Sequence, residues 1–216
     1  MACAHSPTLL AADAFPQVSP DGLQLHHSTQ FNAVYLKPGA TFSQYKRLAL
    51  LDCYVDFAKN WERDYNQDQP GLEGRITPED MNRIKAEVAT EFKSVFTEEL
   101  QTKGGYQIVD VAAPDVLILR PAILNLMVTA PGVDTPDMGF TVVASAGQMT
   151  LYLELWDSTT NTILARVIDT EADPGGVAMV ADRVSNKVAG DRILKHWADL
   201  LRQRLDQVRG TTSGDR

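Results

Sequence analysis

The stretch GQMTLYLELWDSTTNTILARVIDTEAD, residues 147–173, decides the fold of this chain. Every second residue from Met149 to Leu155 is methionine or leucine, which is the period-two pattern of a strand with one buried face. A turn-forming cluster follows at residues 157–162, and the apolar run resumes from Ile163 to Ile168. The stretch therefore predicts a β-hairpin. It contains no nucleophile, ligand cluster or phosphate loop, so it carries structure rather than chemistry.

Two long amphipathic helices are predicted, one before the hairpin and one after it. In the first, Thr77–Lys103, Thr77 is a good N-cap, Pro78 suits the first helical position, and two glycines follow the last turn. Its apolar stripe is Met81, Ile84, Val88, Phe92, Val95, Phe96 and Leu100. The second helix runs from about residue 184 to 208. Its stripe is Val188, Ile193, Leu194, Trp197, Leu200, Leu201, Leu205 and Val208.

The remaining apolar segments predict the other strands. Arg47–Val55 is a nearly continuous apolar run, the pattern of a central strand covered on both faces. Together with Tyr106–Val111 it brackets the first helix, so these two strands should be parallel if they are neighbours. The other predicted strands are Phe31–Leu36, a long strand from Val116 to Thr129 bent at Pro121, and Phe140–Trp156 with a bulge at Gly147.

These elements predict an α+β fold: a single mixed, largely antiparallel sheet with two long helices packed on one face. Residues 1–29 contain several prolines and no sustained period, so they are expected to form a flexible tether that remains after signal-peptide removal. Residues 30–208 then form a single domain, and residues 209–216 form a polar tail.

Composition excludes several classes of protein. The 216 residues are 44% hydrophobic and 22% charged, which are the values of a globular domain. The net charge of −8, with basic residues scattered along the chain, argues against nucleic-acid binding. No apolar run reaches the roughly 18 residues that a membrane-spanning helix needs. Cys53 lies inside an apolar run and is expected to be a small buried thiol.

The N-terminus, Met1-Ala2-Cys3-Ala4, predicts a lipid attachment site at Cys3. A small residue directly before a cysteine, followed by a Ser/Pro/Ala-rich tract, is what remains when a bacterial lipoprotein signal peptide is removed and a start methionine is supplied. The alternative is an accidental cysteine in a tail, because no basic or apolar signal region is present. Ala4, in place of an aspartate after the cysteine, is consistent with sorting to the outer membrane.

Motifs for catalysis or metal binding are absent from the sequence. His26 and His27 are adjacent, so in a strand they would point to opposite faces. There is no G-x-S-x-G elbow, and neither Gly104-Gly105 nor Gly175-Gly176 opens a phosphate loop. We therefore expect no enzyme activity, no metal site and no cofactor.

Asp169, Glu171 and Asp173 form a candidate acidic site. They alternate at the end of the hairpin, so they can share one face of the sheet. General acid–base chemistry would need a cleft that separates their pKa values. Weak calcium binding and a solvated strand end are equally compatible with this pattern.

The segment Asn60–Asn66, NWERDYN, is the candidate interaction site. It lies in a long polar stretch, Asp56–Arg75, which is either partly helical or functional. Its aromatic, arginine and acidic side chains have a composition enriched at protein interfaces. The candidate residues are Trp61, Arg63, Asp64 and Tyr65. The alternative is a structural loop in which Trp61 packs on the sheet and Arg63 pairs with a carboxylate.

Four segments resemble the domain of unknown function 3313 family of bacterial lipoproteins. They are AVYLKPGATFSQYKRLALLDCYVDF at residues 33–57, NWERDYN at 60–66, GQMTLYLELWDSTTNTILAR at 147–166 and HWADLLRQRLD at 196–206. The resemblance implies secretion, lipid attachment at Cys3 and residence at an envelope membrane facing the periplasm. It implies no activity and no catalytic residues. The architecture also looks like the small α/β domains of envelope assembly factors, which bind protein partners.

Three functions remain open. The first is a non-enzymatic, periplasm-facing lipoprotein of the outer membrane that recognises another envelope protein. The second is a carrier or sensor of a small apolar ligand held between the helices and the sheet. An apolar pocket of several hundred cubic ångströms would favour it over the first. The third is an enzyme that uses the carboxylates near Asp169 and Asp173, which a deep cleft with facing carboxylates would favour.

Overall fold

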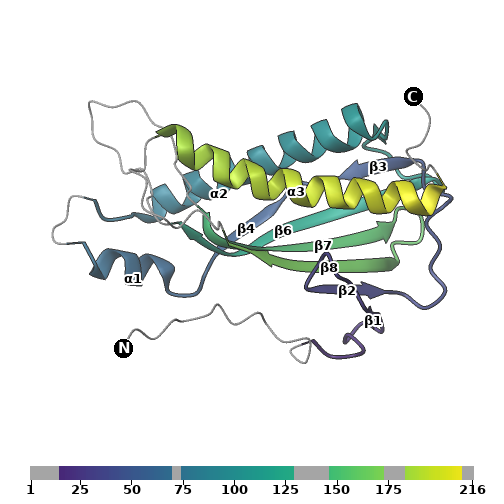
Figure 1. The fold of residues 1–216 in the computed structure, drawn as a ribbon, viewed down its shortest axis with the longest axis horizontal. Coiled ribbons are helices and arrows are strands. Elements are labelled where there is room, and N and C mark those ends of the chain that lie inside the picture. Colours follow the sequence, from purple (N-terminus) through teal and green to yellow (C-terminus); the bar gives the residue numbers. More distant parts are fainter. Residues whose placement is uncertain (1–14, 70–73, 129–145, 173–182, 211–216) are drawn as a thin grey trace.

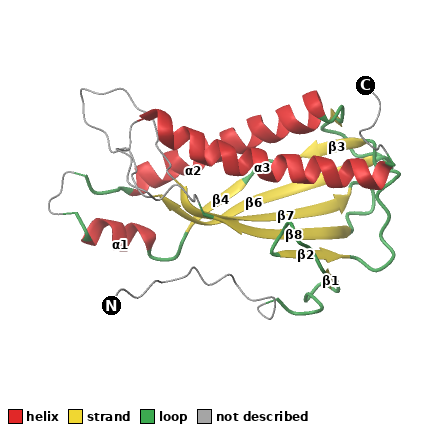
Figure 2. Cartoon of the chain, viewed as in Figure 1, coloured by secondary structure: helices red, strands yellow, loops and turns green. Residues whose placement is uncertain are grey.

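The computed structural model describes residues 15–69, 74–128, 146–172 and 183–210. These residues form eight strands and three α-helices, the second of which continues into a π-helical turn (Figures 1 and 2). The strands are β1 Gln24–His26, β2 Ala33–Leu36, β3 Arg47–Leu50, β4 Tyr54–Phe57, β5 Gln107–Ile108, β6 Val116–Val128, β7 Ala146–Asp157 and β8 Ile163–Glu171. The helices are α1 Trp61–Gln67, α2 Pro78–Thr97 with its π-helical extension η2 Glu98–Lys103, and α3 Arg183–Arg209.

The strands form one mixed sheet in the order β1-β2-β8-β7-β6-β3-β5, with β4 also paired to β6. The pairs β1–β2, β2–β8, β7–β8 and β6–β7 are antiparallel. The pairs β3–β5, β3–β6 and β4–β6 are parallel. The predicted α+β fold with a single mixed sheet is confirmed. The strands that bracket the first long helix, β3 and β5, are parallel neighbours as expected.

The predicted hairpin is β7 and β8, in which Leu153 pairs with Val167. Its turn is held by Asp157, whose carboxylate accepts hydrogen bonds from the backbone N–H groups of Thr159 at 2.9 Å and Thr160 at 2.7 Å. The Tyr45 hydroxyl donates to the same carboxylate at 2.6 Å. These hydrogen bonds hold the pKa of Asp157 well below its usual range, and the bond from Tyr45 has the largest effect.

The apolar run Arg47–Val55 is two strands, β3 and β4, and not the predicted single strand. Both pair with β6, and they are separated at Leu51–Cys53. The Leu51 N–H donates a hydrogen bond to the Leu119 carbonyl of β6 at the point where the pairing of β3 ends. Pro121 lies two residues after Leu119, so its backbone nitrogen faces the same neighbour, but proline has no N–H to donate. A continuous partner strand would therefore lack one ladder bond at this point. The expected burial on both faces was also wrong, since Leu51 is 44% exposed and Tyr54 60% exposed.

The predicted bulge at Gly147 is confirmed by the register of β6 and β7. Met127 pairs with Gln148, while Val128 pairs with Ala146. Gly147 is thus the extra residue on β7, a position where the absence of a side chain lets the strand bend.

Helix α2 begins with a complete capping box. The Thr77 hydroxyl accepts from the Asp80 backbone N–H at 3.2 Å, and the Asp80 carboxylate accepts from the Thr77 backbone N–H at 3.0 Å. The helix widens into η2 at its C-terminal end, where Gly104 donates to the Glu99 carbonyl at 2.9 Å. A β-carbon at Gly104 would lie 2.6 Å from the Leu100 carbonyl oxygen, so glycine is required there.

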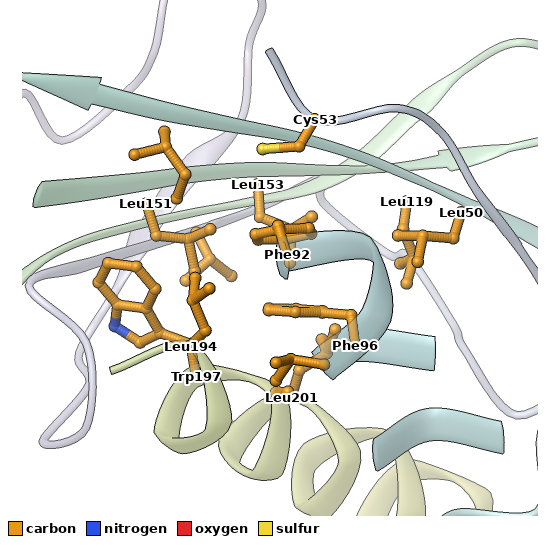
Figure 3. Packing of buried hydrophobic residues seen from close by; sticks show 14 of the residues in the cluster. Leu50, Cys53, Phe92, Phe96, Leu119, Leu151, Leu153, Leu194, Trp197 and Leu201 are labelled. Atoms are coloured by element: carbon orange, nitrogen blue, oxygen red, sulfur yellow. The ribbon is translucent and has the colours of Figure 1, made fainter. Parts of the chain in front are cut away.

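The core lies between the sheet and the two long helices. Phe92 and Phe96 of α2, Trp197 and Leu201 of α3, and Leu153 of β7 belong to one buried cluster (Figure 3). The predicted stripes are largely buried, whereas Val208 is 45% exposed and Val188 lies outside the described side chains. The described residues contain three helices, so the prediction of two was incomplete. The third, α1, is short and lies near the end of the sheet (Figure 1).

Residues 1–29 were predicted to form a tether, but the C-terminal end of this segment is part of the domain. Gln24–His26 forms β1, which pairs with β2 at the edge of the sheet. Leu23 is 1% exposed and packs with Ala33 and Tyr35 in a second small cluster. This strand could not be predicted from the sequence, because a three-residue edge strand is too short to show a period. Residues 1–14, including Cys3, lie outside the described part.

Candidate functional site

A pocket of about 480 Å³ lies between the C-terminal half of α3 and the β2 edge of the sheet. Its walls are largely apolar. Strands β2 and β8 supply Val34, Leu36 and Val167, helix α3 supplies Leu201 and Leu205, and the loop after β2 supplies Phe42. All described helical lining comes from α3, so one helix alone covers this edge of the sheet.

Some of the described lining of this pocket is polar, and one group of polar side chains comes from β1 and the turn after it. His26 is the last residue of β1, His27 follows it, and Ser28 begins the turn that leads to Phe31. The Ser28 hydroxyl accepts from the backbone N–H groups of Gln30 at 3.2 Å and Phe31 at 3.1 Å, which fixes this turn. Sequence reasoning considered the histidines only as metal ligands. Their position beside an apolar pocket depends on the pairing of β1 with β2.

Helix α3 contributes Arg204 and Gln207 to the same lining. The Arg204 guanidinium donates to the Gln207 side-chain oxygen at 2.9 Å. Sequence reasoning missed Arg204. The available signal was its place in the series Leu201, Arg204, Leu205 and Val208, where helical spacing puts a cation in an otherwise apolar stripe.

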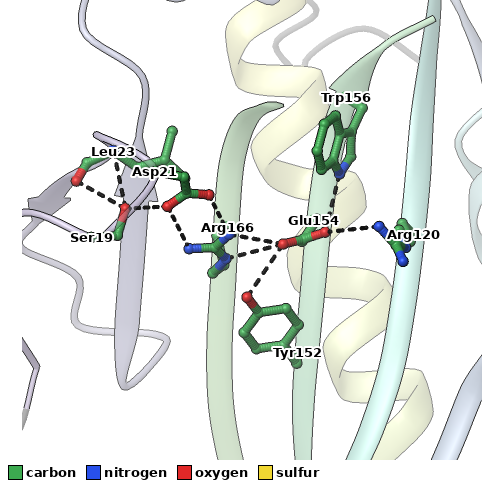
Figure 4. Close-up of polar contacts among 8 residues, drawn as sticks. All are labelled: Ser19, Asp21, Leu23, Arg120, Tyr152, Glu154, Trp156 and Arg166. Atoms are coloured by element: carbon green, nitrogen blue, oxygen red, sulfur yellow. Dashed lines mark hydrogen bonds and ion pairs between the residues drawn. The ribbon is translucent and has the colours of Figure 1, made fainter. Parts of the chain in front are cut away.

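The opposite face of the sheet carries a network of charged groups centred on Arg166 (Figure 4). The Arg166 side chain is 12% exposed and forms ion pairs with Asp21 and with Glu154, which is 11% exposed. Glu154 also accepts hydrogen bonds from the Tyr152 hydroxyl and the Trp156 indole, each at 3.2 Å. The network fastens the segment before β1 to strands β7 and β8.

The electrostatics of this network follow from its hydrogen bonds. The hydrogen bond from Arg166 lowers the pKa of Asp21 to about 2. Burial disfavours the charge of Arg166, yet its bonds to Asp21 and Glu154 raise its pKa above the ordinary value. Asp21 and Arg166 are therefore ionised at neutral pH, and the ion pairs of Arg166 with Asp21 and Glu154 form a structural clamp.

The candidate interaction residues lie on α1 and divide into two pairs. Trp61 is 8% exposed and stacks on Phe57, with ring centroids 4.6 Å apart, and on Tyr65, at 5.5 Å. Arg63 and Asp64 form an ion pair at 2.8 Å with side chains 61% and 59% exposed. The aromatic pair thus belongs to the fold, and the charged pair faces solvent.

The candidate acidic residues also differ from one another. Asp169 is 5% exposed, and its carboxylate accepts from the Trp197 indole at 2.8 Å and the Asn32 backbone N–H at 2.9 Å. The Glu171 Oε1 atom lies 3.5 Å from the His196 Nε2 atom, and burial raises the pKa of Glu171. Asp169 and Glu171 face the same side of β8, as predicted, but Asp169 is buried and not solvated. Asp173 lies outside the described residues.

Other chemical groups are placed as follows. Cys53 is buried with a free thiol, as predicted, and burial raises its pKa to about 12. Across residues 15–69, 74–128, 146–172 and 183–210, no three His, Cys, Asp or Glu side chains are grouped so as to hold a metal ion. No helix in these ranges is both long and apolar enough to cross a membrane.

The chain matches the family described as "Protein of unknown function (DUF3313)" over residues 16–201. No functionally curated protein matches the sequence. The family match starts before β1 and reaches into α3, so it includes the segment fastened by Arg166 and the start of the pocket lining on α3.

Solved structures with a similar arrangement share little sequence with this chain. The PelC dodecamer from Paraburkholderia phytofirmans is 13% identical, covering 76% of this chain and 96% of that one, with a TM-score of 0.36. A DUF330 protein from Xanthomonas campestris is 13% identical over 82% and 94%, with a TM-score of 0.33. Rare lipoprotein B from Shewanella oneidensis is 11% identical over 76% and 94%, with a TM-score of 0.25.

Proposed function

Since the chain belongs to the DUF3313 family, whose description assigns no activity, we propose a function from the geometry. The protein is a non-enzymatic, lipid-anchored envelope protein that binds a small apolar ligand between α3 and the β2 edge of the sheet. The pocket of about 480 Å³ is the observation that carries this proposal. Its volume falls in the range of roughly 300–1,000 Å³ that is usual for small-molecule sites, and its walls are apolar.

The pocket lining, and the buried acid and thiol elsewhere in the described residues, suit binding better than catalysis. Side chains such as Val34, Val167 and Leu205 offer only apolar contact, which favours ligands with little polar surface. The buried carboxylate of Asp169 is occupied by two N–H donors. The thiol of Cys53 is kept protonated by burial at neutral pH. The pocket therefore supports the second of the three functions considered from the sequence.

Filling the pocket is expected to abolish binding of an apolar probe. Ala40 lines the pocket from the loop after β2, so the indole of Ala40→Trp would occupy the space without changing the sheet. Ser43→Trp adds the same group to an exposed position of the same loop. The measurement is the fluorescence of N-phenylnaphthylamine, which rises in apolar surroundings. Wild type and Ser43→Trp should bind the dye, and Ala40→Trp should not. Equal binding by all three would place the dye elsewhere.

Envelope attachment is proposed through Cys3, which the motif Ala2-Cys3 and the family resemblance support. The precursor should be labelled by a fatty acid supplied to the cells, and Cys3→Ser should not be. Cys53→Ser is the matched control, because its thiol is buried in the folded domain and should leave labelling unchanged. Equal labelling of wild type and Cys3→Ser would contradict the anchor.

A second candidate function is recognition of an envelope protein through α1, because the ion pair of Arg63 and Asp64 is exposed. An exposed pair contributes about 0–1 kcal/mol, so Arg63→Ala should fold normally. If α1 is a recognition surface, this variant loses the proteins that co-purify with wild type from envelope extract. A stable variant that keeps all of them would remove α1 from the candidate sites.

Trp61→Ala is the structural counterpart of that test. Its indole stacks between Phe57 and Tyr65, and such aromatic pairs contribute about 0.5–1.5 kcal/mol each beyond burial. We expect a lower melting temperature, with partner recovery falling only in proportion to unfolding. An unchanged melting temperature would show that α1 is not anchored by Trp61.

A further inference from the structure

The pocket combines apolar walls with a cationic group, and this combination selects a ligand class. We propose that it takes a single-chain amphiphile with an anionic head, the chain lying along the apolar walls and the head bound by Arg204, His26 and His27. This inference rests on the proposed ligand-binding function and specifies its ligand.

The charge of the pocket lining favours an anionic head group. The chain as a whole carries a net charge of −8, yet no aspartate or glutamate lines the pocket among the described residues. The lining contains Arg204 and two histidines, whose ring N–H groups are hydrogen-bond donors. An acidic protein thus presents only neutral or positive polar groups at this one place, which is complementary to an anion.

The charge of Arg204 is not neutralised within the described part of the chain. Its hydrogen bond there goes to the neutral side chain of Gln207. The nearby acids of α3 pair with Arg202 instead: Asp199 and Asp206 both contact the Arg202 guanidinium. Arg202 also pairs with the buried Glu99 of η2 at 3.0 Å. Arg204 therefore retains a guanidinium that can bind a carboxylate or phosphate through two parallel N–H donors.

The positions of Arg204 and His26 also suit a head group beside an apolar chain. Arg204 follows Leu201 by three residues and precedes Val208 by four, so its stem lies on the helix face that lines the pocket. Long cationic side chains cover apolar surface with their methylenes and hold the charge at its margin. His26 reaches the same pocket from the sheet, since β1 pairs His26 with Val34, itself a lining residue. Cationic and donor groups from α3 and from β1 thus meet at one pocket, as a head group beside an apolar chain requires.

The test compares three ligands with the same chain: dodecanoate, dodecanol and dodecylammonium, each displacing N-phenylnaphthylamine below its aggregation concentration. A hydrogen bond to a charged group contributes enough to give about tenfold in affinity, so dodecanoate should displace the dye at about tenfold lower concentration than dodecanol. Dodecylammonium should be the weakest of the three. Dodecyl phosphate, run in parallel, separates a phosphate-headed lipid from a carboxylate-headed one.

Arg204→Gln should remove the preference for dodecanoate while leaving dodecanol unchanged. Arg63→Gln removes the same charge from the exposed face of α1 and should keep the preference. Equal displacement by dodecanoate and dodecanol in the wild type would overturn the anionic head and leave the apolar pocket standing. Failure of the dye and of every chain to bind would overturn the pocket function itself.

Discussion

Replacing Phe92 by alanine is expected to lower the free energy of unfolding by about 3–5 kcal/mol, the range for aromatic truncation in a core. Phe92 has no exposed surface and stacks on Phe96, with ring centroids 3.9 Å apart. Both rings lie between α2, α3 and the sheet, so the cavity left by alanine would be closed on every side (Figure 3). Urea unfolding followed by circular dichroism measures the loss.

Two variants control this measurement. Thr90→Ala changes an exposed residue of the same helix and should stay within about 0.5 kcal/mol of the wild type. Phe92→Leu keeps most of the buried volume and should fall between alanine and wild type. A loss below about 1 kcal/mol for Phe92→Ala would show that α2 does not pack on the sheet through this face.

The hairpin and α2 could be predicted because their signals are local. The alternation from Met149 to Leu155 fixes which face of β7 is buried, and the residues that form the turn lie within a few positions of Asp157. The start of α2 is likewise set by Thr77 and Asp80, three residues apart. Each of these elements meets its partners within a short stretch of sequence, so the pattern and the structure agree.

The corrected elements depend on contacts between distant segments. The apolar run Arg47–Val55 suits one long strand, but its pairing with β6 is interrupted beside Pro121, about seventy residues later, which has no N–H to donate. β1 is three residues long and is held in the sheet by its pairing with β2. Neither effect leaves a local pattern. The same holds for Asp169, which is buried because Trp197 of α3 donates to it.

A ligand site between the helices and the sheet was among the hypotheses, but the residues that line the pocket could not be predicted, for a related reason. It joins β1, β2 and the last turns of α3, so its parts lie at opposite ends of the chain. The sequence marked single features: paired histidines at 26 and 27, and a cation within the apolar stripe of the last helix. Only the topology of the sheet, with β2 between the edge strand β1 and β8, brings them together.

Arg166→Met is expected to destabilise the fold by about 3–5 kcal/mol, because removing one partner of a buried ion pair leaves the other charge uncompensated. Glu154, with a side chain 11% exposed, would lose its closest cation, and Asp21 would lose the group that fastens the segment before β1 (Figure 4). Methionine keeps the apolar stem, so the loss measures charge and hydrogen bonding. Arg120→Met is the matched control: Arg120 is 65% exposed and lies 3.8 Å from the same carboxylate, so it should cost less than about 1 kcal/mol.

Two further measurements separate this clamp from simple loss of packing. In the double variant Glu154→Leu with Arg166→Met, no buried charge is left unpaired, so it should be more stable than the sum of the single losses predicts.

The pKa of Asp21 is about 2 in the fold and 3.8 ordinarily. Its contribution to the stability of the fold is therefore complete above the ordinary value and is lost as the pH falls from about 4 to about 2. Asp21→Asn should remove that part of the acid sensitivity. If Arg166→Met and Arg120→Met cost the same, or if the two single losses simply add, the network is not a clamp and the segment before β1 is held by Leu23 and its apolar neighbours alone.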